Sequence, residues 1–169
     1  MLTKKLYLIR HAKSDWETPF CNDWERGLSA RGRKNANSLA KVLAKRNISI
    51  DKAYISDSKR TQHTYAILKQ KREFVKDAQF ESSVYEASAE TLWRQIAELP
   101  DSANSMLLLG HNPGLEELGN RLLTPGLYHS LFFKFPTSAL LLLEAEVDSW
   151  QMFLEQRPGL RFFWIPQRD

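Results

Sequence analysis

The chain has 169 residues and a mass of 19.6 kDa, the size of one ordinary domain with a hydrophobic core. Hydrophobic residues make up 43% and charged residues 26%, fractions typical of globular proteins, which argues against disorder and against collagen-like or repeat architectures. The formal net charge is +4, and no block of five or six like charges occurs. Composition therefore does not call for nucleic-acid binding, and a few arginines serving an anionic substrate explain the charge equally well.

Cysteine content and the N-terminal segment bear on location. Cys21 is the single cysteine, so no intrachain disulfide can form, and a lone thiol fits a reducing compartment. The apolar stretch near the N-terminus, Leu6–Ile9, is too short for a secretory signal. No run of 18 apolar residues occurs, so no membrane span is predicted. We expect a soluble cytoplasmic protein.

Short apolar runs alternate with helical periodicity along the chain. The elements predicted by these patterns are, in order, a strand at Leu6–Ile9, a helix at Ser29–Arg46, a strand at Ala53–Ser56, a helix from an N-cap at Ser58 to about Lys71, an extended piece at Ser83–Tyr85, a helix at Ser88–Leu99, a strand at Met106–Leu109, a helix opening near Gly114, and strand-like runs at Ala139–Leu143 and Trp150–Leu154.

The order of these elements predicts the fold class. Alternating strands and helices favour a three-layer α/β sandwich, in which a mostly parallel sheet carries helices on both faces. The last two runs are separated by Asp148-Ser149 and predict an antiparallel C-terminal edge hairpin. No linker or internal repeat divides the chain, so we expect one domain over residues 1–169.

In such sheets, ligands bind beyond the carboxyl ends of the strands. Two predicted strands run directly into Arg10-His11 and Gly110-His111, and Arg60 follows a third strand near a helix N-terminus, where an anion is favoured. Guanidinium groups match phosphoryl oxygens in bidentate geometry. A neutral imidazole can attack phosphorus and form a covalent phosphohistidine, while fixed cations stabilise the phosphoryl charge. Two histidines and two arginines on one rim therefore predict a phosphate site.

Three segments in chain order carry a family resemblance. They are Leu6–Lys13, the Ser-xxx-Arg-xxx-Thr pattern of Ser56–Thr64, and Gly110–Leu115. Together they resemble the three signatures of the histidine phosphatase superfamily, which has the phosphoglycerate-mutase-like fold. The resemblance extends from about residue 5 to about residue 155.

Further segments are similar to one branch of that superfamily, the short SixA-type phosphohistidine phosphatases. They are Arg10–Ser14, Asp23–Gly32, Tyr85–Leu92 and His111–Leu118. A single Arg-His pair is weak evidence. The ordered set, with the Tyr-Glu-Ala-Ser segment between the second and third signatures, is strong evidence.

The resemblance implies a role for each matching residue. His11 is the expected nucleophile, and Arg10 and Arg60 are expected to clamp the phosphoryl oxygens. His111 is expected to complete the pocket and donate to the same group. Glu86 stands where other branches keep a general acid. The resemblance implies no metal and no organic cofactor.

The role of Glu86 depends on the leaving group. A serine alkoxide needs a proton as it leaves, whereas an imidazole leaving from phosphohistidine can already be protonated. A phosphohistidine phosphatase therefore has little need of Glu86. The alternative interpretation is an acid at the entry to the helix near Ser88, where the helix dipole favours it.

Four residues depart from the family pattern: Ala12 stands where much of the superfamily has Gly, Glu25 and Gly27 where Asp and Pro are expected, and His63 where Gln is common. Ala12 still suits the SixA-type branch. These departures leave the phosphate pocket intact and concern the rim, and hence the substrate. We interpret His63 and His129 as structural, and predict no zinc site because there is no Cys-x-x-Cys and no paired His at helical spacing.

The segment after the first signature is aromatic and basic. We expect Trp16, Phe20 and Trp24 to form a packed loop, with a docking rim as the alternative. Lys13 and Arg31 are expected to be ordinary solvated surface, with a contribution to positive potential as the alternative.

The sequence thus predicts a phosphatase that hydrolyses phosphohistidine through a covalent intermediate on His11. The expected substrate lies on another protein, such as a phosphotransfer domain, because Arg60 and Glu86 are only 26 positions apart and little chain remains to build a lid. One alternative is a phosphatase of small phosphomonoesters or phosphoserine that uses Glu86. Another is a non-catalytic phosphate-binding interaction module. Neither nucleic acid nor a membrane is an expected partner.

Overall fold

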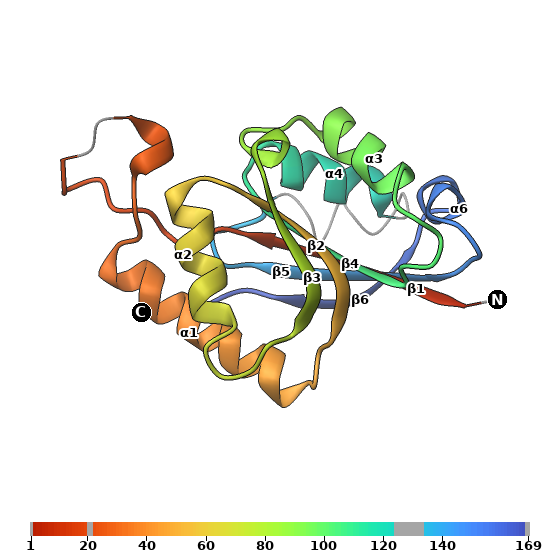
Figure 1. Ribbon diagram of the computed structural model, residues 1–169, viewed down its shortest axis with the longest axis horizontal. Helices are drawn as coiled ribbons and strands as arrows, with labels where there is room; N and C mark the ends of the chain where they lie inside the picture. The colour runs from red at the N-terminus through yellow and green to blue at the C-terminus, as the bar shows by residue number, and fades with distance from the viewer. Residues whose placement is uncertain (1, 20–21, 124–133, 168–169) are drawn as a thin grey trace.

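The computed structural model describes residues 2–19, 22–123 and 134–167 (Figure 1). Within these ranges six strands form one sheet in the order β3-β2-β4-β1-β5-β6. The strands are β1 (Thr3–Arg10), β2 (Ile50–Ser56), β3 (Val75–Glu81), β4 (Ser105–Gly110), β5 (Leu140–Glu146) and β6 (Gly159–Trp164). The pairs β2–β3, β2–β4 and β1–β4 are parallel, whereas β1–β5 and β5–β6 are antiparallel.

Helices cover both faces of this sheet, and Figure 1 shows α1 and α2 on one side and α3, α4 and α6 on the other. The helices are α1 (Ala30–Lys45), α2 (Lys59–Leu68), α3 (Ala89–Ala97), α4 (Gly114–Leu122) and α6 (Trp150–Glu155), and the 3-10 turns are η1 (Asp23–Glu25) and η2 (Ser82–Val84). The predicted three-layer sandwich, with a mostly parallel sheet and an antiparallel C-terminal edge, is confirmed.

The central strand β1 shows how the sequence supplies both cores. Leu6 and Leu8 join the hydrophobic cluster under α3, α4 and α6, while Tyr7 and Ile9 join the cluster under α1 and α2. Successive side chains of a strand point to opposite faces, so an uninterrupted apolar run is what a strand covered on both sides requires.

The predicted strand at Trp150–Leu154 is wrong, because this segment is helix α6. The side chain of Ser149 accepts a hydrogen bond from the backbone N–H of Met152 and caps the helix. Trp150, Phe153 and Leu154 then share one buried face at helical spacing. The strand that pairs with β5 at the C-terminal edge is β6.

The predicted extended piece at Ser83–Tyr85 is also wrong. Ser82–Val84 forms the 3-10 turn η2, and the strand lies just before it, as β3. Along β3 only Val75 is buried, because the strand forms one edge of the sheet. An edge strand needs few apolar side chains, which is why the periodicity did not reveal it. The helix that begins after Ser58 also ends earlier than expected, at Leu68.

The parallel pairing of the central strands positions the candidate site. Arg10 at the end of β1 pairs with Gly110 at the end of β4, and Ile55 near the end of β2 pairs with Leu109. The segments that follow these three strands therefore leave the sheet at the same edge.

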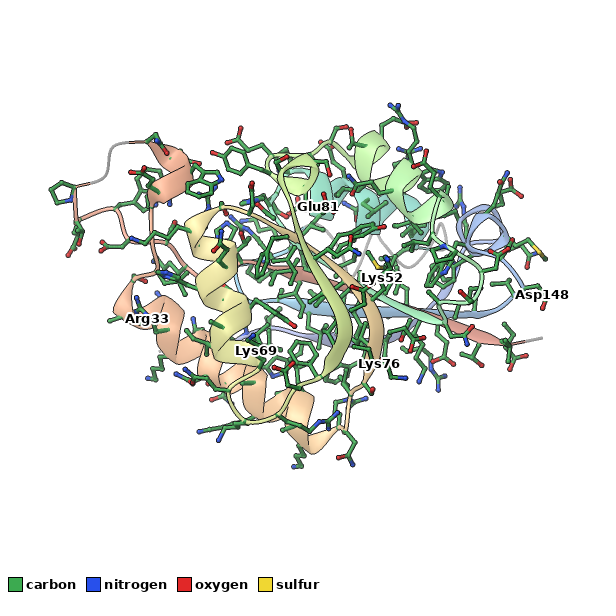
Figure 2. All side chains as sticks on the ribbon, viewed as in Figure 1. Arg33, Lys52, Lys69, Lys76, Glu81 and Asp148 are labelled. Atoms are coloured by element: carbon green, nitrogen blue, oxygen red, sulfur yellow. The ribbon has the colours of Figure 1, made fainter. Side chains whose placement is uncertain are left out.

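Charged side chains are spread around the outside of the molecule, from Arg33 on α1 to Lys76 on β3 and Asp148 before α6 (Figure 2). In the parts of the chain that the structure describes, no helix is long and apolar enough to cross a membrane.

Candidate active site

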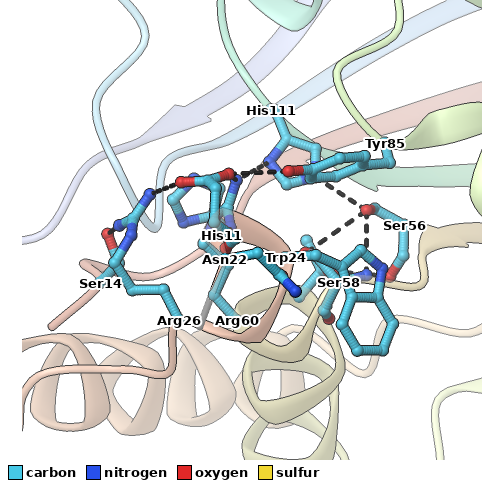
Figure 3. Close-up of polar contacts among 12 residues, drawn as sticks. His11, Ser14, Asn22, Trp24, Arg26, Ser56, Ser58, Arg60, Tyr85 and His111 are labelled. Atoms are coloured by element: carbon cyan, nitrogen blue, oxygen red, sulfur yellow. Dashed lines mark hydrogen bonds and ion pairs between the residues drawn. The ribbon is translucent and has the colours of Figure 1, made fainter. Parts of the chain in front are cut away.

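A pocket of about 540 Å³ lies at the carboxyl edge of the parallel strands. All five residues predicted from the sequence line it: Arg10, His11, Arg60, Glu86 and His111. The structure thus brings together side chains that are far apart in the sequence, from Arg10 to His111. Figure 3 shows His11, His111 and Arg60 gathered at this site.

His11 is buried directly behind β1, and its ring is oriented by a backbone contact. The Nδ1 atom lies 2.7 Å from the carbonyl oxygen of Ala12. A carbonyl only accepts hydrogen bonds, so Nδ1 carries the proton and Nε2 keeps its lone pair. Burial lowers the pKa of the His11 imidazole to about 3, and the charges of Arg10 and Arg60 act in the same direction. His11 is therefore neutral at neutral pH, the state required of a nucleophile.

His111 follows β4, and its ring centroid lies 5.1 Å from that of His11. Its Nε2 atom is 2.8 Å from the Ser56 hydroxyl, and its Nδ1 atom is 3.3 Å from Nη2 of Arg60. Burial, followed by the charge of Arg60, lowers the pKa of His111 to about 3. The second pocket histidine is therefore also neutral.

Two arginines supply positive charge inside the pocket. Arg60 lies in the first turn of α2 and is only 4% exposed, and Arg10 ends β1 and donates from Nη1 to the carbonyl of Phe135 at 3.2 Å. The Nε atoms of both arginines are buried and have no hydrogen-bond partner among the residues that the structure describes. A buried N–H without a partner is costly, and an oxyanion is the acceptor that a guanidinium pair satisfies best.

Glu86 lies at the pocket rim, between η2 and α3, and its side chain is exposed. Its backbone has φ 51°, in the left-handed region that residues other than glycine rarely adopt. The turn thus holds a strained residue at the pocket edge, a feature often found at functional sites.

Asp23 is a site residue that the sequence reasoning did not single out. Arg60 donates to Asp23 twice, from Nη1 to its carbonyl at 2.8 Å and from Nη2 to its carboxylate at 3.0 Å. Arg26 and the hydroxyl of Tyr85 also donate to this carboxylate. Burial alone would raise the pKa of Asp23, but these donors and the charge of Arg60 hold that pKa far below its ordinary value. Asp23 is therefore an anionic anchor for Arg60.

Ser56 is a second residue without an assigned role in the sequence reasoning. It ends β2, is fully buried, and its hydroxyl contacts His111. The resemblance placed Ser56 at the start of the second signature and Asp23 at the start of a SixA-like run. The position of Ser56 and Asp23 in those segments was the sequence signal for their importance. Only the fold shows that Ser56 contacts His111 and that Asp23 contacts Arg60.

The packed-loop expectation for the aromatic segment is wrong for the residues that the structure describes. Trp16 is 68% exposed, lines the pocket and stacks against the guanidinium of Arg26 at 3.5 Å. Trp24 is 38% exposed and donates from its indole N–H to Asp57 at 3.1 Å. Phe20 lies outside the described residues.

Two exposed cations, Lys13 and Arg31, line the same pocket, so they add positive potential at its mouth rather than only to general surface. His63 lies in α2, is half-buried and does not line this pocket, and its structural interpretation stays a prediction. His129 lies outside the described residues.

The geometry above can be compared with known proteins. The profile of the histidine phosphatase superfamily (branch 1) matches residues 6–101, and the chain belongs to this superfamily. Its structural neighbours place it within the SixA type. A protein from Agrobacterium tumefaciens named phosphohistidine phosphatase SixA superposes with a TM-score of 0.80 at 30% identity, over 96% of this chain and 99% of that one.

A second SixA structure, from Nakamurella multipartitia, superposes with a TM-score of 0.84 at 19% identity, over 97% of this chain and 96% of that one. Among curated proteins, an uncharacterized chloroplastic protein of Arabidopsis thaliana is 28% identical over 94% of this chain and 74% of its own length. Matches to 2,3-bisphosphoglycerate-dependent phosphoglycerate mutases span less than half of this chain and about a third of those proteins. The family and the SixA-type neighbours support phosphatase activity.

Proposed function

We propose that this protein hydrolyses phosphohistidine on another protein through a covalent phosphohistidine at His11. The observation that carries the proposal is the state of His11: buried and neutral, with Nδ1 bound to the Ala12 carbonyl, in a pocket shared with two arginines. That arrangement is the one a nitrogen nucleophile needs beside a phosphoryl group.

The reaction proceeds in two displacements at phosphorus. In the first, Nε2 of His11 forms a bond to phosphorus as the bond from phosphorus to the substrate imidazole breaks, and the imidazole leaves protonated. In the second, water attacks phosphorus, the bond to Nε2 breaks, and inorganic phosphate and neutral His11 are released. Arg10 and Arg60 stabilise the charge on the phosphoryl oxygens in both steps.

Three features of the pocket mouth support a protein as the carrier of the phosphohistidine. Only η2 and residues 85–88 lie between β3 and α3, so this connection forms no lid. Trp16 is exposed at the mouth, and tryptophan is enriched where proteins contact each other. Lys13 and Arg31 favour an acidic surface around the phosphorylated side chain. A phosphotransfer domain fits this description, and a cytoplasmic location remains a prediction from the single Cys21.

A substrate panel with trapping of the intermediate tests the proposal. We expect turnover of a phosphohistidine protein well above that of phosphoserine peptides and sugar phosphates, with acid-labile phosphate trapped on the chain. His11→Ala should reduce turnover at least about a thousandfold and abolish trapping, because it removes the nucleophile. His63→Ala is the matched control outside the pocket. Absence of turnover and of trapped phosphate on every substrate would instead indicate the non-catalytic binding module.

A second candidate function is hydrolysis of small phosphomonoesters or phosphoserine, and the position of Glu86 on the pocket rim favours it. As a general acid, Glu86 would protonate an alkoxide leaving group, so Glu86→Gln should slow phosphoserine hydrolysis about a hundredfold. Phosphohistidine hydrolysis should be almost unchanged. Glu90→Gln on α3 is the control, because Glu90 pairs with Arg121 outside the pocket. Equal loss on both substrates would contradict the leaving-group argument.

A further inference from the structure

A chain of buried hydroxyl groups lies behind His111. Nε2 of His111 is 2.8 Å from Oγ of Ser56, which is 3.4 Å from Oγ of Ser58 (Figure 3). Oγ of Ser58 is in turn 2.6 Å from Oγ1 of Thr61, which donates back to the Ser56 carbonyl at 2.6 Å. All three hydroxyl-bearing residues are fully buried, so the protein itself determines which way these hydrogens point.

The direction of the chain follows from the number of hydrogens on each group. Arg60 can only donate, so Nδ1 of His111 accepts and carries no hydrogen. The single ring hydrogen then lies on Nε2 and is donated to Ser56, whose own hydrogen points to Ser58. Ser58 donates to Thr61, since the Thr61 hydrogen is committed to a backbone carbonyl. The resting protein therefore holds neutral His111 in the Nε2–H form.

This form does not suit the proposed reaction. Phosphoryl oxygens are acceptors, and in the resting form Nδ1 presents a lone pair beside Arg60, toward the phosphate clamp. To donate from Nδ1, the ring must either gain a second proton or move its one hydrogen from Nε2 to Nδ1.

Protonation of His111 is opposed by its surroundings. Burial is the main cause of the lowered pKa, followed by Arg60, and two more cations, Arg10 and Arg26, act in the same direction. Asp23 acts in the opposite direction and is the counter-charge among these groups. The uncharged Tyr85 ring and the neutral His11 ring also lie against the imidazole.

We propose that Ser56 is a positioning residue that reverses its hydrogen bond to His111 when a phosphoryl group enters the pocket. The Ser56 hydroxyl hydrogen turns from Ser58 to Nε2 of His111, and the neutral ring then donates from Nδ1 to the phosphoryl oxygen. The ring takes one proton from water at Nδ1 and gives its Nε2 proton to water, so the charge of the ring is unchanged and no other reactant is needed. This inference rests on the proposed function.

The contacts of Ser56 make the reversal inexpensive. The hydrogen bond that Ser56 gives up, to Ser58, is long at 3.4 Å and therefore weak. The bond that it gains, to Nε2, has a donor–acceptor distance of 2.8 Å. The backbone N–H of Ser58 continues to donate to the Ser56 hydroxyl at 3.3 Å in both arrangements.

Nitrogen NMR of the histidine rings tests the reversal, with orthovanadate as the tetrahedral probe. In the free protein we expect His111 in the neutral Nε2–H form, and with vanadate bound in the neutral Nδ1–H form. A charged ring with vanadate bound, or an unchanged Nε2–H form, would overturn the inference and leave the proposed function standing. Failure of vanadate to bind the pocket at all would overturn the proposed function, and the inference with it.

Variants test the same residue by turnover. Ser56→Ala should lower kcat at least about tenfold with little change in KM, because the bond it removes matters as charge develops on the phosphoryl group. The loss of kcat in Ser56→Ala should shrink as the pH falls. A doubly protonated His111 ring already carries a hydrogen on Nδ1, so it donates to the phosphoryl oxygen without a change at Ser56. Ser56→Thr keeps the hydroxyl and should recover most of kcat. Ser58→Ala, equally buried but not in contact with His111, should have a much smaller effect. Equal losses in Ser56→Ala and Ser58→Ala would overturn the inference.

Discussion

Burial determines the charge state of the two pocket histidines. Both rings lie behind strand ends with little exposure, 6% for His11 and 5% for His111, and burial lowers each pKa to about 3. In the unfolded chain both have ordinary values of about 6.5. Neutral rings beside guanidinium groups avoid an accumulation of positive charge in the pocket, and a neutral His11 is what the proposed reaction requires.

This charge state predicts how stability depends on pH. Because the folded pKa values are lowered, the unfolded state binds more protons once the pH falls below about 6.5, and the free energy of unfolding decreases from there toward about pH 3. Each histidine contributes a slope of about 1 kcal/mol per pH unit in that window. His11→Asn should therefore show a shallower decline than the wild type in urea unfolding between about pH 7 and about pH 5, in phosphate-free buffer. Identical slopes would contradict a neutral, buried His11.

The lowered pKa of Asp23 favours the charged form of its side chain, whereas the lowered pKa values of the two histidines favour their neutral form. Asp23 holds Arg60 in place through two contacts, one to its backbone carbonyl and one to its carboxylate, and the carboxylate also accepts hydrogen bonds from Arg26 and Tyr85. The depressed pKa keeps the carboxylate ionised throughout the range in which the enzyme is expected to work. Arg60 is thus positioned by the protein itself, and in the proposed function this lowers the cost of ordering it during binding.

At the level of elements, helix α1 fixes the segment that follows His11. The backbone N–H of Ser29 donates to the carbonyl of Lys13 at 3.0 Å, one residue before α1 begins. A Cβ atom on Gly32 would lie 2.1 Å from the same Lys13 oxygen. Only glycine permits this close approach, so the first turn of α1 locks the loop that follows His11.

Gly32→Ala should therefore damage both stability and turnover. Relief of the clash requires movement of backbone, and we expect a loss of about 1–3 kcal/mol in the free energy of unfolding together with a lower kcat. Gly159→Ala is the matched control, because a Cβ there would lie at an ordinary 3.8 Å from the Glu144 oxygen. Urea unfolding and phosphatase assays on both variants provide the measurement, and an unaffected Gly32→Ala protein would contradict the locking role.

At the level of the whole molecule, part of the net positive charge lies at the pocket mouth. Lys13 and Arg31 line the pocket beside Arg10 and Arg60, while other cations such as Lys41 on α1 lie outside it. A hollow lined mainly by one sign of charge raises the rate of encounter with an oppositely charged partner. The acidic phosphoprotein of the proposed function is such a partner.

Removal of one rim charge tests this arrangement. Arg31→Gln should lower kcat/KM for a phosphohistidine protein several-fold and leave a small aryl phosphate less affected, because the extra contact is with the carrier protein. Lys41→Gln removes the same charge from the same helix and should have little effect. Added salt should lower the wild-type kcat/KM and narrow the difference between the variants. Equal effects of the two substitutions would indicate that only net charge matters.

Much of the site could be predicted from the sequence because several of its residues lie at the ends of predicted strands or directly after them. The apolar runs before Arg10-His11 and Gly110-His111 indicate buried strands, and parallel strands deliver their carboxyl ends to one edge. The α/β class and the pocket members followed from local patterns together with family resemblance. The edge strand β3 and helix α6 did not follow, because an exposed edge has a weak pattern and a short apolar run fits a strand or a helix equally well.

Local sequence patterns, together with the family resemblance, thus predicted the fold class, the superfamily and four side chains that line the pocket. Tertiary contacts settled the rest: the neutrality of His11 and His111, the anchoring of Arg60 by Asp23, and the hydroxyl chain behind Ser56. Those properties depend on desolvation and on hydrogen-bond partners 37 and 55 positions apart in the chain, for Asp23–Arg60 and Ser56–His111 respectively. These properties arise from contacts between residues that are far apart in the chain, and a local sequence pattern does not contain information on those contacts.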